Sequence, residues 1–484
     1  MLRLVCSPLE SDCAVVNNLV IDPEVNINVV DVQHGFTPLM RLCAFNQSKS
    51  FRGFFAALLR RDDIDVSIKD GTGNHALHLH CFANSLNVVE DVVRQLINRG
   101  CDLNAKDQNG YNVLHRLLGN RPSECQNLVD LCRWFIDSGA DAHAITNNGD
   151  TPLILLCRNA SGDEIIDVIK LLVVFYNSSV KATNKIGETA LHCLCANSSK
   201  FENFLEAIHL LVQFGINAEV VTEEGENALL LVCKHSPDSK TSLFAVVRFL
   251  LDDVKLDPNH NNSQGESALH CLFANPFLTQ EFIEVARCLV NKGTDVHSKT
   301  INQSNILHQL CKNASFCSTG LLQFLVDCGV DVQGVNGKGE NALHLLLKRP
   351  RSSFQSQNIM DCVALLISFG IDVKQKTNKE WNALHFMCHR KSISTADLRL
   401  LVDKGADLKS VTNEGETALH ILCRRYKKEN LFDLIRILAE DDRPQDLMAK
   451  NKDGLNPVKL LWKRKGEMEG DVNIEEIIQF LISF

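Results

Sequence analysis

Several features of common protein classes are missing from this chain of 484 residues. No apolar run reaches the roughly 18–20 residues that a membrane-spanning helix needs. The opening residues, MLRLVCSPLESDC, contain no continuous apolar segment like that of a secretory signal peptide. The motifs GxxxxGK[ST], HExxH and GxSxG are absent, as is a GxGxxG that follows a strand. Nothing in the sequence therefore points to a membrane protein, a secreted protein or a familiar enzyme class.

An excess of positive charge is also lacking. The 59 Asp and Glu residues outnumber the 50 Lys and Arg residues, and the net charge of −9 disfavours broad binding to nucleic-acid phosphates. A hydrophobic content of 45% with 23% charged residues is ordinary for a globular protein. The 19 cysteines are odd in number and dilute in a long chain, which favours a reducing compartment. We expect a cytoplasmic protein, with the nucleus as an alternative, that binds neither nucleic acid nor membrane.

What the chain does contain is a repeat. Strong copies of one motif begin at Gly149 (GDTPLILLC), Gly187 (GETALHCLC) and Gly415 (GETALHILC). Two weaker copies lack the glycine, at Gln303 and Glu380. No linker rich in Pro, Gly or Ser interrupts the pattern, so residues 1–484 are predicted to form a single continuous array. The twelve anchors stand near 35, 73, 110, 149, 187, 225, 265, 303, 339, 380, 415 and 454, about 38 residues apart.

A thirteenth copy is expected to be cut off at the N-terminus. Cys6 stands 37 residues before Cys43, so LRLVC is predicted to end the first helix of a repeat. The chain is therefore expected to open inside a repeat.

At these residues the sequence resembles the ankyrin-repeat family. Thr189-Ala190-Leu191-His192 matches the family's turn and first helix, and Gly139-Ala140-Asp141 matches the end of its second helix. The resemblance covers essentially the whole chain, although the period exceeds the family's 33 residues by about five. It implies an all-α solenoid of helix-turn-helix units joined by turn or hairpin fingers. It implies a non-catalytic, monomeric scaffold for protein partners, with no cofactor.

Three residue types recur at fixed distances from the anchor. The resemblance implies that the histidine bonds backbone groups of the turn, which we prefer to a metal or acid–base role. The cysteine is expected to be a small buried residue in the place of alanine. The asparagine is predicted to end the first helix in the left-handed conformation. The histidines are His78, His115, His192, His270, His308, His344, His385 and His420, the cysteines are Cys43, Cys81, Cys157, Cys195, Cys233, Cys311, Cys388 and Cys423, and the asparagines are Asn46, Asn84, Asn120, Asn159, Asn197, Asn275 and Asn313.

The resemblance also implies that a partner docks on the concave side, along the tips of the turns. The residue after the anchor is expected to project outward there, and it is often a glutamate. Such glutamates either keep the turns soluble or form an acidic edge that attracts a partner with a basic surface. Aromatic residues at the same position would be anchors. These candidate partner-binding residues are Tyr111, Glu188, Glu226, Glu266, Glu340, Trp381 and Glu416.

Two other functional classes stay open beside the independent scaffold. One is an adaptor that recruits a substrate to a ubiquitin ligase. The other is the repeat portion of a larger channel, kinase or signalling protein whose effector domain lies elsewhere. Neither alternative predicts a catalytic residue, a cofactor site or a metal site in these residues.

Overall fold

The computed structural model describes residues 22–44, 51–83, 90–119, 128–160, 162, 164–197, 203–235, 242–275, 281–313, 318–349, 356–426, 430–439, 448–464 and 474–483. All regular elements in these ranges are helices, and none is a strand. The predicted all-α class is therefore confirmed. Residues 2–6, in which the truncated repeat was predicted, lie outside the described ranges.

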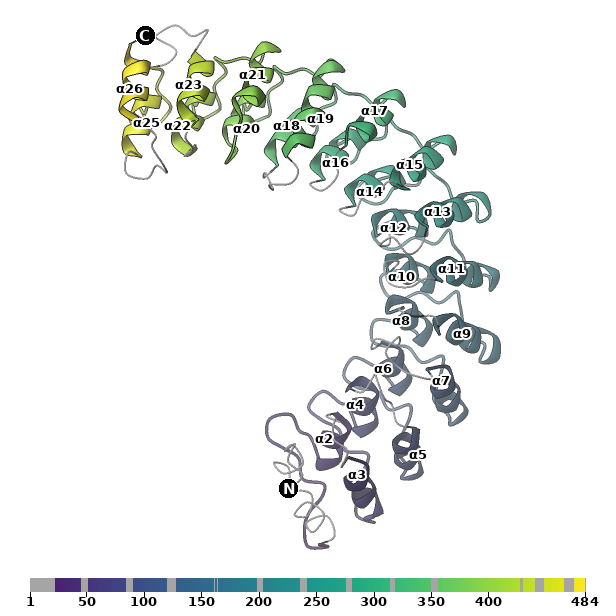
Figure 1. Ribbon diagram of the computed structural model, residues 1–484. Coiled ribbons are helices and arrows are strands. Elements are labelled where there is room, and N and C mark those ends of the chain that lie inside the picture. Colours follow the sequence, from purple (N-terminus) through teal and green to yellow (C-terminus); the bar gives the residue numbers. More distant parts are fainter. Residues whose placement is uncertain are drawn as a thin grey trace. The chain divides into compact units, whose positions relative to one another are not determined.

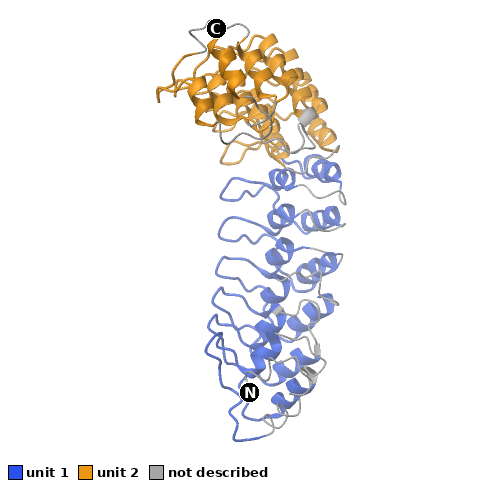
Figure 2. Ribbon diagram, turned by 60° about the vertical axis from the view of Figure 1, so that its left-hand side comes forward, with its two compact units in different colours: residues 1–256 blue, residues 257–484 orange. Residues whose placement is uncertain are grey.

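Contacts between Cα atoms divide the chain into two compact units, residues 1–256 and residues 257–484 (Figure 2). Within each unit the helices follow one another in pairs. We call the first helix of each pair, which follows the anchor, the inner helix, and the second one the outer helix. Figure 1 shows the inner helices side by side in one row and the outer helices in a second row behind them within each unit.

The inner helices of the first unit are α2 (Pro38–Ala44), α4 (Ala76–Ala83), α6 (Val113–Gly119), α8 (Pro152–Arg158), α10 (Ala190–Ala196) and α12 (Ala228–Lys234). Its outer helices are α3 (Phe51–Arg60), α5 (Glu90–Asn98), α7 (Leu128–Asp137), α9 (Ile165–Lys170) with the π-helical η3 (Leu171–Phe175), α11 (Phe204–Gln213) and α13 (Leu243–Asp252).

The inner helices of the second unit are α14 (Ala268–Ala274), α16 (Ile306–Lys312), α18 (Ala342–Lys348), α20 (Ala383–Cys388), α22 (Ala418–Arg425) and α25 (Pro457–Lys463). Its outer helices are α15 (Glu281–Asn291), α17 (Thr319–Asp327), α19 (Ser356–Ser368), α21 (Thr395–Asp403), α23 (Leu431–Ala439) and α26 (Ile474–Ile482).

Local sequence explains where an inner helix starts. In α10 the hydroxyl of the N-cap Thr189 accepts a hydrogen bond from the backbone N–H of His192, and the imidazole of His192 in turn accepts one from the N–H of Thr189. This reciprocal pair satisfies two backbone donors that a helix start leaves without partners. The same capping box, with Asn as the N-cap, starts α16, α18 and α20.

Burial explains why the helices occur in rows. Every residue of α10 from Ala190 to Cys195 is buried, because α8 and α12 flank it and α11 covers it from behind. Helix α11 is amphipathic and buries Phe204, Ala207, Ile208 and Leu211. A short helix that is apolar all round cannot be stable by itself, so each inner helix depends on its neighbours.

The anchor glycines allow the turns to stack. Gly187 has φ 78°, and a Cβ built on it would lie 3.2 Å from the backbone O of Val221 in the next turn. That turn is joined to its predecessor by a hydrogen bond of 3.0 Å from the N–H of Glu223 to the O of Ile186. Gln303 and Glu380, the two anchors without glycine, adopt the same left-handed region at φ 57° and 60°. The backbone geometry therefore persists where the glycine is lost.

Six of the eight repeated histidines link their inner helix to the backbone of the next repeat, as the resemblance implied. Nε2 of His308 lies 3.0 Å from the backbone O of Glu340, and Nε2 of His385 lies 3.0 Å from that of Glu416. Burial lowers the pKa of His385 to about 4, so the imidazole is neutral at physiological pH. The hydrogen bonds occupy both ring nitrogens, which leaves neither free for catalysis.

The prediction for the asparagines is wrong. The residues that follow α8, α10, α14 and α16 have φ values of −106°, −103°, −65° and −71°, none of which is left-handed. Instead, the side-chain amide donates to backbone carbonyls: Nδ2 of Asn197 lies 2.8 Å from the O of Ala160 in the preceding repeat. Asn313 likewise donates to the O of Phe273, at 3.0 Å. Asn197 and Asn313 are thus hydrogen-bond donors between repeats, whereas Asn159 donates to the O of Leu155 in its own helix. Asn46, Asn84 and Asn120 lie outside the described residues.

Candidate partner-binding surface

The glutamates predicted to project from the turns do not do so. Glu226, Glu340 and Glu416 are buried, with 7%, 5% and 6% of their surface exposed. Glu188 and Glu266 are half-buried. The expected outward-facing acidic edge is therefore wrong as a description of these five side chains, and their role in partner binding stays a prediction.

Each buried glutamate instead forms an ion pair with the end of its own inner helix. Oε1 of Glu340 lies 2.8 Å from Nζ of Lys348, and Oε1 of Glu226 lies 2.6 Å from Nζ of Lys234. Two further pairs, Glu416 with Arg424 and Asp150 with Arg158, have the same spacing of eight residues. The acid lies beside the turn and the base at the helix C-terminus, where a cation is also favoured by the helix dipole. An acid after the anchor with Lys or Arg eight residues later was the sequence signal that could have revealed this ion pair.

Glu188 extends this network between two repeats. Its Oε2 lies 2.8 Å from Arg158, which also contacts Asp150 at 2.8 Å. The amide of Asn184 donates to both carboxylates, at 2.9 Å each. Burial alone would raise the pKa of Asp150, but the hydrogen bonds from Arg158 and Asn184 outweigh it and lower the pKa below its ordinary value. Both carboxylates are therefore engaged by the same guanidinium within the repeats and do not project toward a partner.

Glu266, in the second unit, has no such ion pair among the described residues. Its Oε2 accepts a hydrogen bond of 3.0 Å from the amide of Asn262, within its own turn. Gln309 of the next inner helix contacts its other oxygen at 3.5 Å.

The two aromatic candidates are half-buried. Tyr111 lies under the guanidinium of Arg116, whose carbon is 4.9 Å from the ring centroid. Trp381 packs against Phe386 and His389, with centroid distances of 5.1 and 5.6 Å. Both side chains are therefore fixed in place by their own repeat, and each keeps part of its surface accessible.

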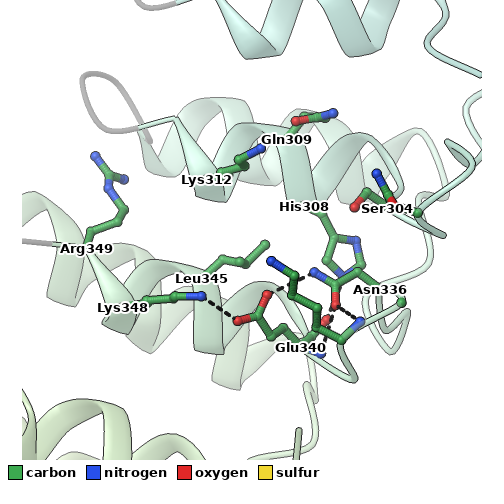
Figure 3. Close-up of a pocket in the computed structure, with 12 residues that line it drawn as sticks. Ser304, His308, Gln309, Lys312, Asn336, Glu340, Leu345, Lys348 and Arg349 are labelled. Carbon is green, nitrogen blue, oxygen red and sulfur yellow. Dashed lines mark hydrogen bonds and ion pairs between the residues drawn. The ribbon is translucent and has the colours of Figure 1, made fainter. Parts of the chain in front are cut away.

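The second unit contains a hollow between the turns and inner helices α16 and α18. It has a volume of about 570 Å³, and Ser304, His308, Gln309 and Leu345 are among its lining residues. In Figure 3 Lys348 points toward Glu340, which also contacts Asn336 from its own turn. Burial alone would raise the pKa of Glu340, but Lys348 and Asn336 outweigh it and lower the pKa. The carboxylate is thus charged and already engaged.

A second hollow of about 800 Å³ lies along α18, α20 and the end of α22. It shares Lys338, Glu340, Lys348 and Arg349 with the first hollow, so the two hollows adjoin. We call these two adjoining hollows together the basic trough. Of the predicted candidates it contains Glu340 and Trp381, whereas the other five do not line it. Its charged lining residues are Lys312, Lys338, Lys348, Arg349, Lys379, Arg390, Lys391, Arg425 and Glu340.

Other kinds of site have little support in the described ranges. No three His, Cys, Asp or Glu side chains of these residues gather so that they could hold a metal ion. None of the described helices has the length and apolar character required to span a bilayer. The repeated cysteines are free and buried, as predicted. Burial raises the pKa of Cys193, beside the repeated Cys195, to about 12, which disfavours the thiolate that a metal or a nucleophilic mechanism needs.

Sequence comparisons agree with this geometry. The family described as ankyrin repeats in three copies matches residues 351–451, and the single ankyrin repeat matches residues 72–108. The chain is 27% identical over 115 residues to the ankyrin repeat protein OPG189 of Variola virus, which covers 24% of this chain and 21% of that protein. It is 32% identical over 96 residues to the ankyrin repeat protein FPV234 of fowlpox virus, which covers 20% and 21%. The matched segment thus spans about a fifth of the length of each of these relatives.

A further similarity is to a Dictyostelium discoideum protein named as a serine/threonine-protein kinase. The two chains are 45% identical over 60 residues, which is 12% of this chain and 6% of that one. Sixty residues amount to less than two repeats of this chain. The family matches, the paired helices and the histidine-linked turns together show that this chain contains ankyrin repeats.

Proposed function

We propose that this chain is a non-catalytic scaffold that binds a protein partner on the concave side of its repeats, where the inner helices and turns lie. The basic trough is the observation that carries the proposal. It is a large depression lined by turns and inner helices, and its lining combines cations with the accessible part of Trp381. Aromatic residues and arginine are enriched at protein interfaces, which are bordered by a polar rim.

The repeated polar residues support a binding role over a catalytic one. Histidines, buried acids and cysteines recur at equivalent positions, where they stabilise the turns and the inner helices. Catalysis needs groups with different roles gathered at one place. We propose that the protein acts in the cytoplasm as a monomeric array. The alternative is that these repeats are the binding portion of a larger adaptor, channel or signalling protein.

Site-specific photo-crosslinking tests the proposal. A benzophenone amino acid is placed on the inner side at Phe82 or Lys379 and on the outer helices at Glu206 or Asp403, all of which are exposed. We expect the same protein, identified by mass spectrometry, to crosslink from inner positions and not from outer ones. Crosslinking from the outer positions alone would contradict the proposed binding side.

A further inference from the structure

The charge of the basic trough differs sharply from that of the unit that contains it. Residues 257–484 hold 28 Lys and Arg and 28 Asp and Glu, whereas residues 1–256 hold 22 and 31. The second unit is therefore neutral, and the first carries the net negative charge of the chain. The trough nevertheless has eight cationic side chains in its lining and a single carboxylate, that of Glu340. That carboxylate is already paired with Lys348.

Several of these cations have no evident structural task. Lys348 pairs with Glu340, and buried Arg390 donates to the carbonyl of Leu347 at 3.0 Å, so both stabilise the repeats. Lys338 and Lys379 differ, because they are exposed at the tips of two consecutive turns. No carboxylate among the described residues forms a salt bridge with either. Their backbones are adjacent, since the N–H of Asn378 donates to the O of Lys338 at 2.9 Å.

The opposite edge of the trough is also cationic. Lys312 is the last residue of α16, Lys391 follows α20, and Arg425 is the last residue of α22; all three are exposed. A lysine at a helix end is favoured by the helix dipole, so Lys312 alone would indicate little. Lys338, Lys379 and Lys391 are not at helix ends, and this explanation does not apply to them. Two rows of positive charge thus border a floor that includes Leu345, Trp381 and Phe386.

From this arrangement we infer that the basic trough binds an acidic peptide segment that carries one aromatic or large apolar side chain. The two rows of cations complement carboxylates on both sides of an extended backbone, and the partly exposed ring of Trp381 packs against the apolar side chain. The trough extends over three to four repeats, and the two to three spacings of about 10 Å between them give a length of roughly 20–30 Å. An extended peptide covers that length with about six to nine residues. This inference rests on the proposed function and makes it specific, and it replaces the basic partner expected from sequence with an acidic one.

The test uses a fluorescein-labelled peptide of nine residues, with Glu and Asp around one central Phe. Binding to the full chain is followed by fluorescence anisotropy at 50 mM salt. We expect saturable binding that weakens at least fivefold at 300 mM salt, because charged contacts are screened. The peptide with Gln and Asn in place of the acids should bind at least tenfold more weakly.

The variant K338E/K379E should weaken binding of the acidic peptide at least tenfold. The matched control is K181E/K185E, which makes the same charge change at two exposed lysines of the first unit. The control should bind within twofold of the unchanged chain. Circular dichroism verifies that both variants fold, which we expect because Lys338 and Lys379 contribute only backbone groups to the hydrogen bonds between turns. W381A should weaken binding of the peptide that contains Phe, and it should leave binding of the same peptide with Gly in place of Phe unchanged.

Three results would overturn the inference. The first is that the acidic peptide shows no saturable binding below about 1 mM. The second is that K338E/K379E binds the peptide as tightly as the unchanged chain does. The third is that a nine-nucleotide oligothymidylate binds more tightly than the peptide. The last result would assign the trough to single-stranded nucleic acid. Photo-crosslinking of a partner at Phe82 together with any of these results would leave the proposed function standing and remove only the acidic-peptide inference.

Discussion

His308 and Glu340, separated by 32 residues, are joined by a hydrogen bond of 3.0 Å between Nε2 of the imidazole and a backbone oxygen. The other ring nitrogen, Nδ1, accepts from the backbone N–H of the N-cap Asn305 at 3.2 Å. Nε2 therefore carries the proton and donates it, and the neutral ring connects the start of one inner helix to the turn of the next repeat. The same arrangement in other repeats makes the fold sensitive to protonation of histidine.

Stability should fall as the pH drops below neutrality. Burial lowers the pKa of His115, His344 and His385 from 6.5 to about 4. Between about pH 4 and pH 6.5 the unfolded chain binds more protons than the folded chain, so the free energy of unfolding falls as the pH is lowered through that window. It is fully retained above that window. We expect the melting temperature to be constant from pH 8 to 7 and to fall steadily from pH 6.5 to 5.

A pair of variants assigns this effect to the buried rings. H385Q should lower stability at pH 7.5 and flatten the pH dependence. H297Q, at an exposed histidine, should change neither. Equal pH profiles for H385Q and H297Q would contradict the assignment.

Stability should also depend on the anchor glycines. In G187A the alanine would have to keep the left-handed conformation of Gly187, and its Cβ would lie 3.2 Å from backbone atoms of the next turn. We expect the free energy of unfolding to fall by about 1–2 kcal/mol. G320A is the control, because a Cβ at Gly320 meets no atom within 4 Å and Ala is the better helix former. E380G should gain about 1 kcal/mol, since Glu380 adopts φ 60° without being glycine. Urea unfolding measures all three, and a loss of stability in E380G would refute the explanation.

Reversal of the charge of a buried glutamate should destabilise the protein itself. E226K places an ammonium group beside Lys234 in a buried position, and we expect a loss of about 2 kcal/mol. The exchange variant E226K/K234E restores opposite charges and should recover part of that loss. Thermal unfolding distinguishes the two. Full stability of E226K would show that the ion pair contributes nothing.

The repeated cysteines should react slowly with thiol reagents in the native protein. Cys157, Cys388 and Cys423 are fully buried, and burial raises the pKa of each thiol far above its ordinary value, so little thiolate forms. Half-exposed Cys328 should react sooner. Mass spectrometry of alkylated protein with and without denaturant identifies each site. Prompt native labelling of the repeated cysteines would show that the inner helices open readily.

The chain should behave as one array when it is digested. The uninterrupted period predicts that early cleavage falls between the two helices of a repeat, as from Arg349 to Gln357, and not at one boundary between two domains. Residues 350–355 of that segment lie outside the described ranges. The time course of limited trypsin digestion, read by mass spectrometry, tests this. Two equally stable fragments that meet near residue 256 would favour two separate domains.

The sequence by itself determined the repeat, the helix class and the turn geometry. These depend on local rules: an N-cap such as Thr189 starts a helix, Gly187 permits a positive φ, and the spacing of Leu191 and Leu194 creates an apolar stripe. Because the same pattern recurs about every 38 residues, a copy whose motif is weak can be interpreted by alignment with the stronger copies. The partners of the histidines followed from resemblance to the family.

Only the tertiary structure decided where polar side chains point. The sequence predicted that Glu340 projects from an exposed turn, but its carboxylate is buried and paired with Lys348 at the end of the following helix. The side-chain amide of Asn197 donates to the carbonyl of Ala160 in another repeat. Such choices depend on neighbours that are distant in sequence. The basic trough is the same kind of feature, because Lys338 and Lys379 lie 41 residues apart in the chain and become neighbours only when the turns stack. The period of the sequence thus predicts the backbone structure, whereas packing between repeats determines which side chains are buried and which are exposed.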